Sequence, residues 1–200
     1  MKAFIFDTET TWFTVKWGSL DEQPYIIQFA WVLGEISKEK WFKEIERVNL
    51  LIKPRIPIPF ASSQINWIYD KDVADAPYIE EVFDIILKYL NTSDVIVGHN
   101  IEFDEEVVKY ELERAGRKWD YQPSKSICTM RSSTDFCQLQ GRGISYKPPK
   151  LNELHLKLFW ERFSWAHNAM IDVEATARVF EELVKKWIIE LEKNNIMRLF

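Results

Sequence analysis

Cysteine is scarce in this chain of 200 residues, with only Cys128 and Cys137. Their spacing fits neither a Cys-x-x-Cys pair nor a disulfide framework, so we expect two reduced thiols. Long apolar runs are also missing, and no stretch approaches the length needed to cross a membrane. The residues before Asp7 are too few for a signal-peptide core. These absences predict a cytoplasmic protein with no membrane association.

An excess of positive charge is absent as well. The chain has 26 Lys and Arg against 31 Asp and Glu, a net charge of -5, so it lacks a global basic field that would hold long nucleic acid. The charge does not exclude a nucleic-acid substrate that is bound only at one end, with metal ions offsetting the negative charge. Hydrophobic residues make up 46% and charged residues 28%, which predicts one globular domain over residues 1–200. Nine Trp and thirteen Phe are unusual; we expect most in the core and some facing a stacking ligand.

The apolar patterns predict an α/β domain with a central mixed sheet flanked by helices. An antiparallel meander is expected first, and β–α crossovers follow it. The helix after Pro77 is expected to bury a stripe formed by Val82, Ile85, Ile86 and Tyr89. Strands are predicted at 4–10, 25–33, 41–52, 94–97 and 127–128, and turns or loops at 11–19, 34–40, 53–60 and 141–149. Besides the helix after Pro77, helices are predicted at 61–69, 103–114, 151–159 and 168–193.

Two carboxylates end the first predicted strand. Asp7 and Glu9 are separated by one residue, so they point to the same face, on the order of 7 Å apart at Cα. Like charges beside a buried strand repel each other and resist desolvation, and a divalent cation between them would relieve both costs. The alternative is that both carboxylates cap a turn or are solvated at the strand's end.

Two further acids lie where they can join this pair. Asp104 follows the strand at 94–97 and falls in the first turn of the next helix, near the sheet edge where α/β proteins place ligand-contacting groups. Asp172 lies early in the last long helix. For both, the alternative is a carboxylate favourably placed at a helix N-terminus.

His167 precedes Asp172 by five residues, an offset that separates the two on one regular helix. They converge only if Asn168 is the N-cap and His167 lies in the turn before the helix. A histidine next to acids is then a candidate general base, and a surface or hydrogen-bonded histidine is the alternative.

The three segments resemble a known family. Asp7-Thr8-Glu9-Thr10, then Gly98-His99-Asn100-Ile101-Glu102-Phe103-Asp104, then His167-Asn168-Ala169-Met170-Ile171-Asp172 match in order the three motifs of the DEDDh 3′–5′ exonucleases. This family includes the proofreading subunit of bacterial DNA polymerase III and has a ribonuclease H-like fold. Each motif is short, but three in order with all four acids and the histidine are specific. His-x4-Asp rather than Tyr-x3-Asp indicates the histidine branch.

The resemblance implies two divalent cations, Mg²⁺ or Mn²⁺, held by Asp7, Glu9, Asp104 and Asp172, with His167 as general base. It implies release of nucleoside 5′-monophosphates from single-stranded nucleic acid with a free 3′ end, with DNA favoured over RNA. A DNA polymerase or a second copy of the chain is a candidate partner. The residues expected to contact substrate are Thr8, Thr10, Trp12, Phe13, Ile65, Asn100 and Phe103.

Two of the segments that depart from the family's pattern concern the expected substrate contacts. Trp12-Phe13 stands where the family commonly has Gly-Leu, with the leucine wedged against the terminal bases. Ile65-Asn66-Trp67-Ile68 stands where many members have Ile-His-Gly-Ile. All four acids and the histidine are nevertheless present, which favours an enzyme over the alternative, a non-catalytic module that binds nucleic-acid ends or a polymerase on the same fold.

Overall fold

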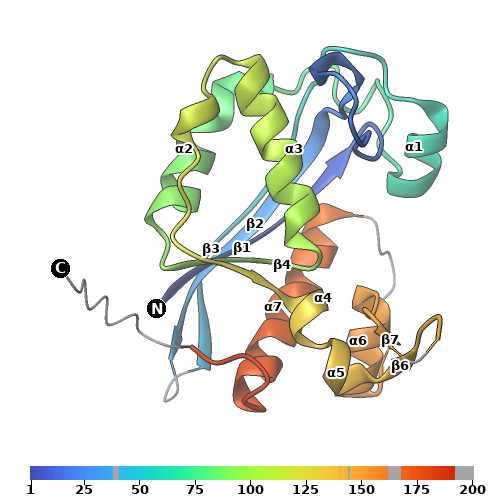
Figure 1. Ribbon diagram of the computed structural model, residues 1–200. Helices are drawn as coiled ribbons and strands as arrows, with labels where there is room; N and C mark the ends of the chain where they lie inside the picture. Colours follow the sequence, from blue (N-terminus) through green and yellow to red (C-terminus); the bar gives the residue numbers. More distant parts are fainter. Residues whose placement is uncertain (38–40, 144, 162–167, 192–200) are drawn as a thin grey trace.

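A five-stranded mixed sheet forms the centre of the computed structural model, which describes residues 1–37, 41–143, 145–161 and 168–191. The strand order is β3-β2-β1-β4-β5 (Figure 1). The first three strands, β1 (Lys2–Thr10), β2 (Ile26–Ser37) and β3 (Trp41–Leu51), pair antiparallel. β4 (Val95–Gly98) pairs parallel with β1, and β5 (Ser126–Cys128) pairs parallel with β4. The predicted meander and mixed sheet are confirmed.

Helices cover both faces of this sheet. The alternating side chains of β1 divide between two apolar clusters. Phe4 and Phe6 pack with α2 (Ile79–Thr92) and α3 (Ile101–Arg114), whereas Ala3 and Ile5 pack with residues of α6 (Leu151–Phe159) and α7 (Ala169–Lys185). In Figure 1, α2 and α3 lie on one side of the sheet and α7 on the other. The central strand is therefore buried on both faces, which is why it reads as a continuous apolar run.

Short elements connect this framework. The proline-rich connector and the short helix after it, α1 (Phe60–Asn66), are confirmed. The loop expected near residue 141 is the tip of a two-stranded ribbon.

Both cysteines are free, as expected, and both are buried. Within the described ranges, no helix combines the length and hydrophobicity of a membrane span. The remaining short elements are η1 (Leu20–Glu22), η2 (Lys118–Asp120), α4 (Thr129–Ser132), α5 (Thr134–Cys137), β6 (Leu139–Gln140) and β7 (Tyr146–Lys147).

Three sequence predictions are wrong in detail. The turn expected from residue 34 begins later, because β2 continues to Ser37 and buries Ile36 against α7. In α2, Ile85 is exposed, since the buried face runs through Phe83, Ile86 and Leu90 instead. The last helix ends at Lys185 rather than near 193, and Trp187 just beyond it is 65% exposed.

Candidate active site

β1 carries two acids at the end that follows its buried segment. Asp7 and Glu9 continue the row begun by Ala3 and Ile5, so they point toward the face that α7 covers. The pairing of β1 with β2 shifts register between Glu9 and Thr10. An irregularity of this kind bends a strand and ends its regular pairing. The chain leaves the sheet directly beyond the acids.

The third acid, Asp172, comes from the first turn of α7. The Asn168 side chain caps this helix by accepting hydrogen bonds from the backbone N–H groups of Met170 and Ile171, at 3.2 and 3.4 Å. The predicted N-cap is confirmed. Carboxylate oxygens of Asp7, Glu9 and Asp172 lie within 4.8 Å of one another. Two distant segments of the chain thus bring three carboxylates together.

Gln28 attaches the start of α7 to the sheet. Its side-chain oxygen accepts from the Ala169 N–H at 3.0 Å, and its amide nitrogen donates to Asn49 on β3 at 2.9 Å. Gln28 is 2% exposed and pairs with Glu9 across the β1–β2 ladder. It therefore fixes the helix that carries Asp172 relative to the strand that carries Glu9. The sequence analysis missed this residue, since the one available signal was a lone glutamine inside an apolar strand.

The fourth acid, Asp104, lies on the opposite side of β1, in the first turn of α3. One of its oxygens accepts two hydrogen bonds from Thr8, from the backbone N–H at 2.9 Å and from the hydroxyl at 2.7 Å. Thr8 belongs to the row of Phe4 and Phe6, which faces α3. Asp104 is 3% exposed. The Thr8 hydroxyl is therefore committed to holding an acid, an interaction that the motif alone does not reveal.

Burial and mutual repulsion make the charged forms of these acids costly. Burial, reinforced by Asp104, Asp172 and Glu9, holds the pKa of Asp7 well above its usual range. Burial and the charges of Asp172 and Asp104 raise the pKa of Glu9 to about 8. Burial also raises the pKa of Asp104 to about 7, although its hydrogen bonds from Thr8 act in the opposite direction.

A cation fits the chemistry of this cluster. Among the residues that the structure describes, no positively charged side chain contributes to the pKa shifts of Asp7, Glu9 or Asp104. A divalent ion among them would supply the missing positive charge and restore the ionised carboxylates. The donor set consists entirely of carboxylate oxygens, which suits a hard cation such as Mg²⁺ or Mn²⁺ rather than a thiophilic metal.

His167 lies outside the described residues. Its neighbour Asn168 has extended backbone angles and caps α7, as the prediction required. The role of His167 as general base remains a prediction. A different histidine, His99, connects the second motif to the rest of the domain. Its Nδ1 lies 3.0 Å from the Thr129 hydroxyl, and its Nε2 lies 3.0 Å from the Pro149 carbonyl oxygen.

The loop after β1 and the helix α1 are attached to the same point. The Thr10 carbonyl accepts from the Ser62 hydroxyl at 2.9 Å and lies 3.5 Å from the Asn66 amide nitrogen. The Thr10 hydroxyl donates to the Trp12 carbonyl at 2.5 Å. Figure 1 places α1 and this loop at the end of the sheet where β1 terminates. Both segments are held beside the acids by the backbone of Thr10.

The residues expected to contact substrate differ in accessibility. Trp12 and Phe13 are exposed and meet edge to face, with ring centroids 5.6 Å apart, and Ile65 on α1 is exposed as well. Asn100 is exposed in a left-handed conformation just before α3, whereas Phe103 is half-buried against the core. Thr8 and Thr10 are buried. The exposed members offer ring and amide surface, and the threonines position their neighbours.

The fold is ribonuclease H-like, as two comparisons with solved structures show. Exonuclease X in complex with 5′ overhanging duplex DNA superposes with a TM-score of 0.61 at 23% identity, covering 92% of each chain. An E. coli ExoI–ssDNA complex superposes with a TM-score of 0.69 at 20% identity, covering 92% of this chain and 40% of that one. At these identities the likeness establishes the fold.

Sequence comparison establishes the family. Residues 4–180 match the family RNase_T, described as exonuclease, so the chain belongs to this exonuclease family. The 3′-5′ exonuclease DinG of Bacillus subtilis is 30% identical over 186 residues, covering 91% of this chain and 17% of that protein. DNA polymerase III PolC-type of Caldanaerobacter subterraneus subsp. tengcongensis is 28% identical over 182 residues. The match covers 91% of this chain and 11% of that protein. The chain thus spans under a fifth of the length of these relatives.

Proposed function

We propose that this chain is a metal-dependent 3′–5′ exonuclease that removes terminal nucleotides from single-stranded nucleic acid, with DNA as the first substrate and RNA as the second. The observation that carries the proposal is the convergence of Asp7, Glu9 and Asp172, with oxygens within 4.8 Å, beside a fourth buried acid. The exonuclease family to which the chain belongs supports the same reading.

Asp7, Glu9, Asp104 and Asp172 are the residues that would hold two divalent cations, Mg²⁺ or Mn²⁺. When bound, such ions lower the pKa of a water molecule and stabilise negative charge on the leaving oxygen. Thr8 holds one Asp104 oxygen through two hydrogen bonds, which orients the carboxylate before any ion arrives. Gln28 does the same for the helix that carries Asp172.

His167 takes the proton from the attacking water in this proposal. The water oxygen forms a bond to the terminal phosphorus, and the bond from phosphorus to the preceding 3′ oxygen breaks. That oxygen leaves with the shortened strand and takes up a proton from solvent water. The products are a nucleoside 5′-monophosphate and a strand with a new 3′ hydroxyl. Asn168 supports this role, because its cap starts α7 immediately after His167.

The 3′ end would lie at the end of β1. Trp12, Phe13 and Ile65 expose apolar surface there, and unpaired bases stack on such surface without regard to sequence. Thr8, Thr10, Asn100 and Phe103 would position the terminal nucleotide. DNA in the complexes of exonuclease X and ExoI supports a DNA substrate, and PolC-type relatives support a polymerase as partner; a homodimer is the other candidate.

A cleavage assay tests the proposal. Single-stranded DNA and RNA of matched sequence, labelled at the 5′ end, are incubated with Mg²⁺, Mn²⁺ or a chelator. We expect a ladder that shortens from the 3′ end and disappears with chelator and in Asp172→Asn. Glu174→Gln is the matched control, since Glu174 lies on the same helix and pairs with Arg47 away from the acids. No cleavage by a folded, metal-binding protein would favour the non-catalytic binding module.

A further inference from the structure

Tryptophan occupies an unusual backbone conformation in this chain. Seven described residues other than glycine have positive φ; two are Asn100 and Gln138, and the other five are tryptophans with φ between 48° and 65°, namely Trp17, Trp41, Trp67, Trp160 and Trp187. The left-handed region crowds Cβ against the backbone, and bulky residues are genuine outliers there. Only two described glycines, Gly116 and Gly143, have positive φ. Tryptophan thus occupies this region more often than glycine does.

The ends of α3 and α7 provide a direct comparison. After α3, the Gly116 N–H donates to the Glu113 carbonyl at 3.1 Å and the next N–H donates to Leu112 at 2.8 Å. After α7, the Trp187 N–H donates to the Val184 carbonyl at 3.1 Å and the next N–H donates to Leu183 at 2.9 Å. Both are Schellman motifs, whose left-handed position is usually glycine. Trp187 occupies the position that Gly116 occupies.

Two more helices end in the same way. Trp67 follows α1 with φ 61° and ψ 19°, and its N–H donates to the Ser63 carbonyl at 3.0 Å. Trp160 follows α6 with φ 59° and ψ 19°, and its N–H donates to the Leu156 carbonyl at 2.9 Å. Each is a left-handed helix cap, again a position where glycine is preferred.

The indole rings at these positions contribute little to the core. The exposed fraction is 92% for Trp17, 89% for Trp160 and 66% for Trp67, whereas Trp31, with ordinary backbone angles, is fully buried. Glycine is correspondingly rare, with 6 residues, where an ordinary composition of about 7% gives roughly 14 in 200. Trp67 also stands where many of the exonucleases that this chain resembles have glycine.

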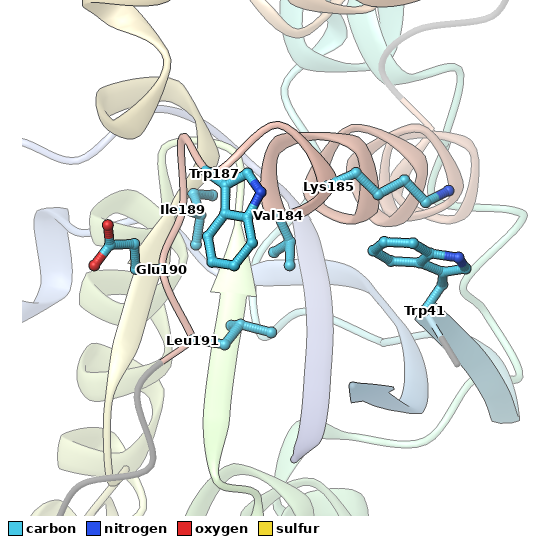
Figure 2. Close-up of a pocket in the computed structure, with 7 residues that line it drawn as sticks. All are labelled: Trp41, Val184, Lys185, Trp187, Ile189, Glu190 and Leu191. Carbon is cyan, nitrogen blue, oxygen red and sulfur yellow. The ribbon is translucent and has the colours of Figure 1, made fainter. Parts of the chain in front are cut away.

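The cavity in Figure 2 is lined in part by two of these residues. Trp41 at the start of β3 and Trp187 after α7 line it together with Lys185, whose Nζ lies 5.2 Å from the Trp41 ring centre. The volume is about 280 Å³. Two of its seven lining residues are therefore tryptophans at left-handed positions.

We infer that positions 17, 41, 67, 160 and 187 are glycine positions, and that the native chain carries glycine there because its cell reads the corresponding codons as glycine rather than tryptophan. UGA is the codon whose reading differs between genetic codes, as stop, tryptophan or glycine, and UGG encodes tryptophan throughout. This inference is independent of the proposed function.

Codons and peptide masses test the inference directly. We expect UGA at all five positions and UGG at Trp31 in the gene. Mass spectrometry of the protein purified from its own cells should give peptides with glycine at positions 17, 67 and 187 and with tryptophan at position 31. UGG codons at the five positions, or tryptophan in the native peptides, would overturn the assignment.

Thermal unfolding tests the conformational basis in the recombinant chain. Trp187→Gly and Trp160→Gly should each raise the melting temperature by about 2–4 °C, because glycine removes the left-handed strain. Trp119→Gly is the matched control, since Trp119 is 81% exposed but has no positive φ, and it should give no increase. If neither Trp187→Gly nor Trp160→Gly melts at a higher temperature than the unsubstituted chain, the inference is contradicted.

Discussion

Thr8 and Asp104 connect the central strand to α3 through two hydrogen bonds. The Thr8 backbone N–H and hydroxyl both donate to the same Asp104 oxygen, at 2.9 and 2.7 Å, although the residues are 96 positions apart. These two bonds fix the orientation of the Asp104 carboxylate. Hydrogen bonds of this kind orient carboxylates that bind metal ions.

Thr8→Val should lower the cleavage rate about tenfold, because hydrogen bonds to charged groups contribute about 1.5–3 kcal/mol and each ~1.4 kcal/mol corresponds to a factor of ten. The measurement is kcat and KM on 5′-labelled single-stranded DNA. Thr8→Ser keeps the hydroxyl and should retain most of the rate. A normal rate in Thr8→Val together with a loss in Thr8→Ser would contradict the prediction, because it would show that the methyl group, through packing, is what matters.

Metal binding should stabilise the fold through the acidic cluster. At a hundred times the dissociation constant, a ligand bound only by the native state contributes about 2.7 kcal/mol, or about 5–10 °C in melting temperature for a domain of this size. We expect Mn²⁺ to produce this shift in the wild type and in Glu174→Gln, and to lose most of it in Asp172→Asn. A full shift in Asp172→Asn would remove Asp172 from the ligand set.

His99 should make stability fall in acid. Burial lowers the pKa of His99 to about 4, well below the ordinary 6.5 of an unfolded chain. Between these values the unfolded state binds the extra proton, so this stabilisation is complete above about pH 6.5 and is lost as the pH falls to 4. The loss reaches at most about 3 kcal/mol.

Urea unfolding at several pH values measures this effect. The free energy of unfolding of the wild type, minus that of His99→Gln, should decrease from pH 7 to pH 4. Subtracting the variant removes the contribution of carboxylates common to both proteins. A difference that stays constant with pH would show that His99 titrates normally in the fold.

Sequence reasoning located the acids because their signals are local. Alternation along β1 puts Asp7 and Glu9 on one face, and an asparagine before an apolar helix predicts the Asn168 cap. The end of α7 was missed for a physical reason. Apolar residues continue beyond Lys185, and the left-handed residue that ends the helix is a tryptophan, which carries no stop signal.

The contacts between distant segments were not predictable from the sequence. The Thr8–Asp104 bonds depend on how α3 crosses β1, and the Gln28 bonds depend on which strand lies under the start of α7. The prediction that Ile85 is buried in α2 was wrong because Ile85 and Ile86 are adjacent in sequence. An apolar pattern does not say which of two neighbouring residues faces the sheet.

Gln28→Leu should disturb the site without touching the acids. The substitution keeps a similar volume but leaves the Ala169 N–H and the Asn49 side chain without their partner, which costs about 1–3 kcal/mol of unfolding free energy. Because Ala169 begins the helix that carries Asp172, we also expect weaker Mn²⁺ binding and slower cleavage. Asn49→Ala is the control, since it spares the bond between Gln28 and Ala169. It should lower stability while leaving Mn²⁺ affinity near the wild-type value, and an equal loss of affinity in both variants would mean that β3 packing, rather than the Ala169 bond, positions Asp172.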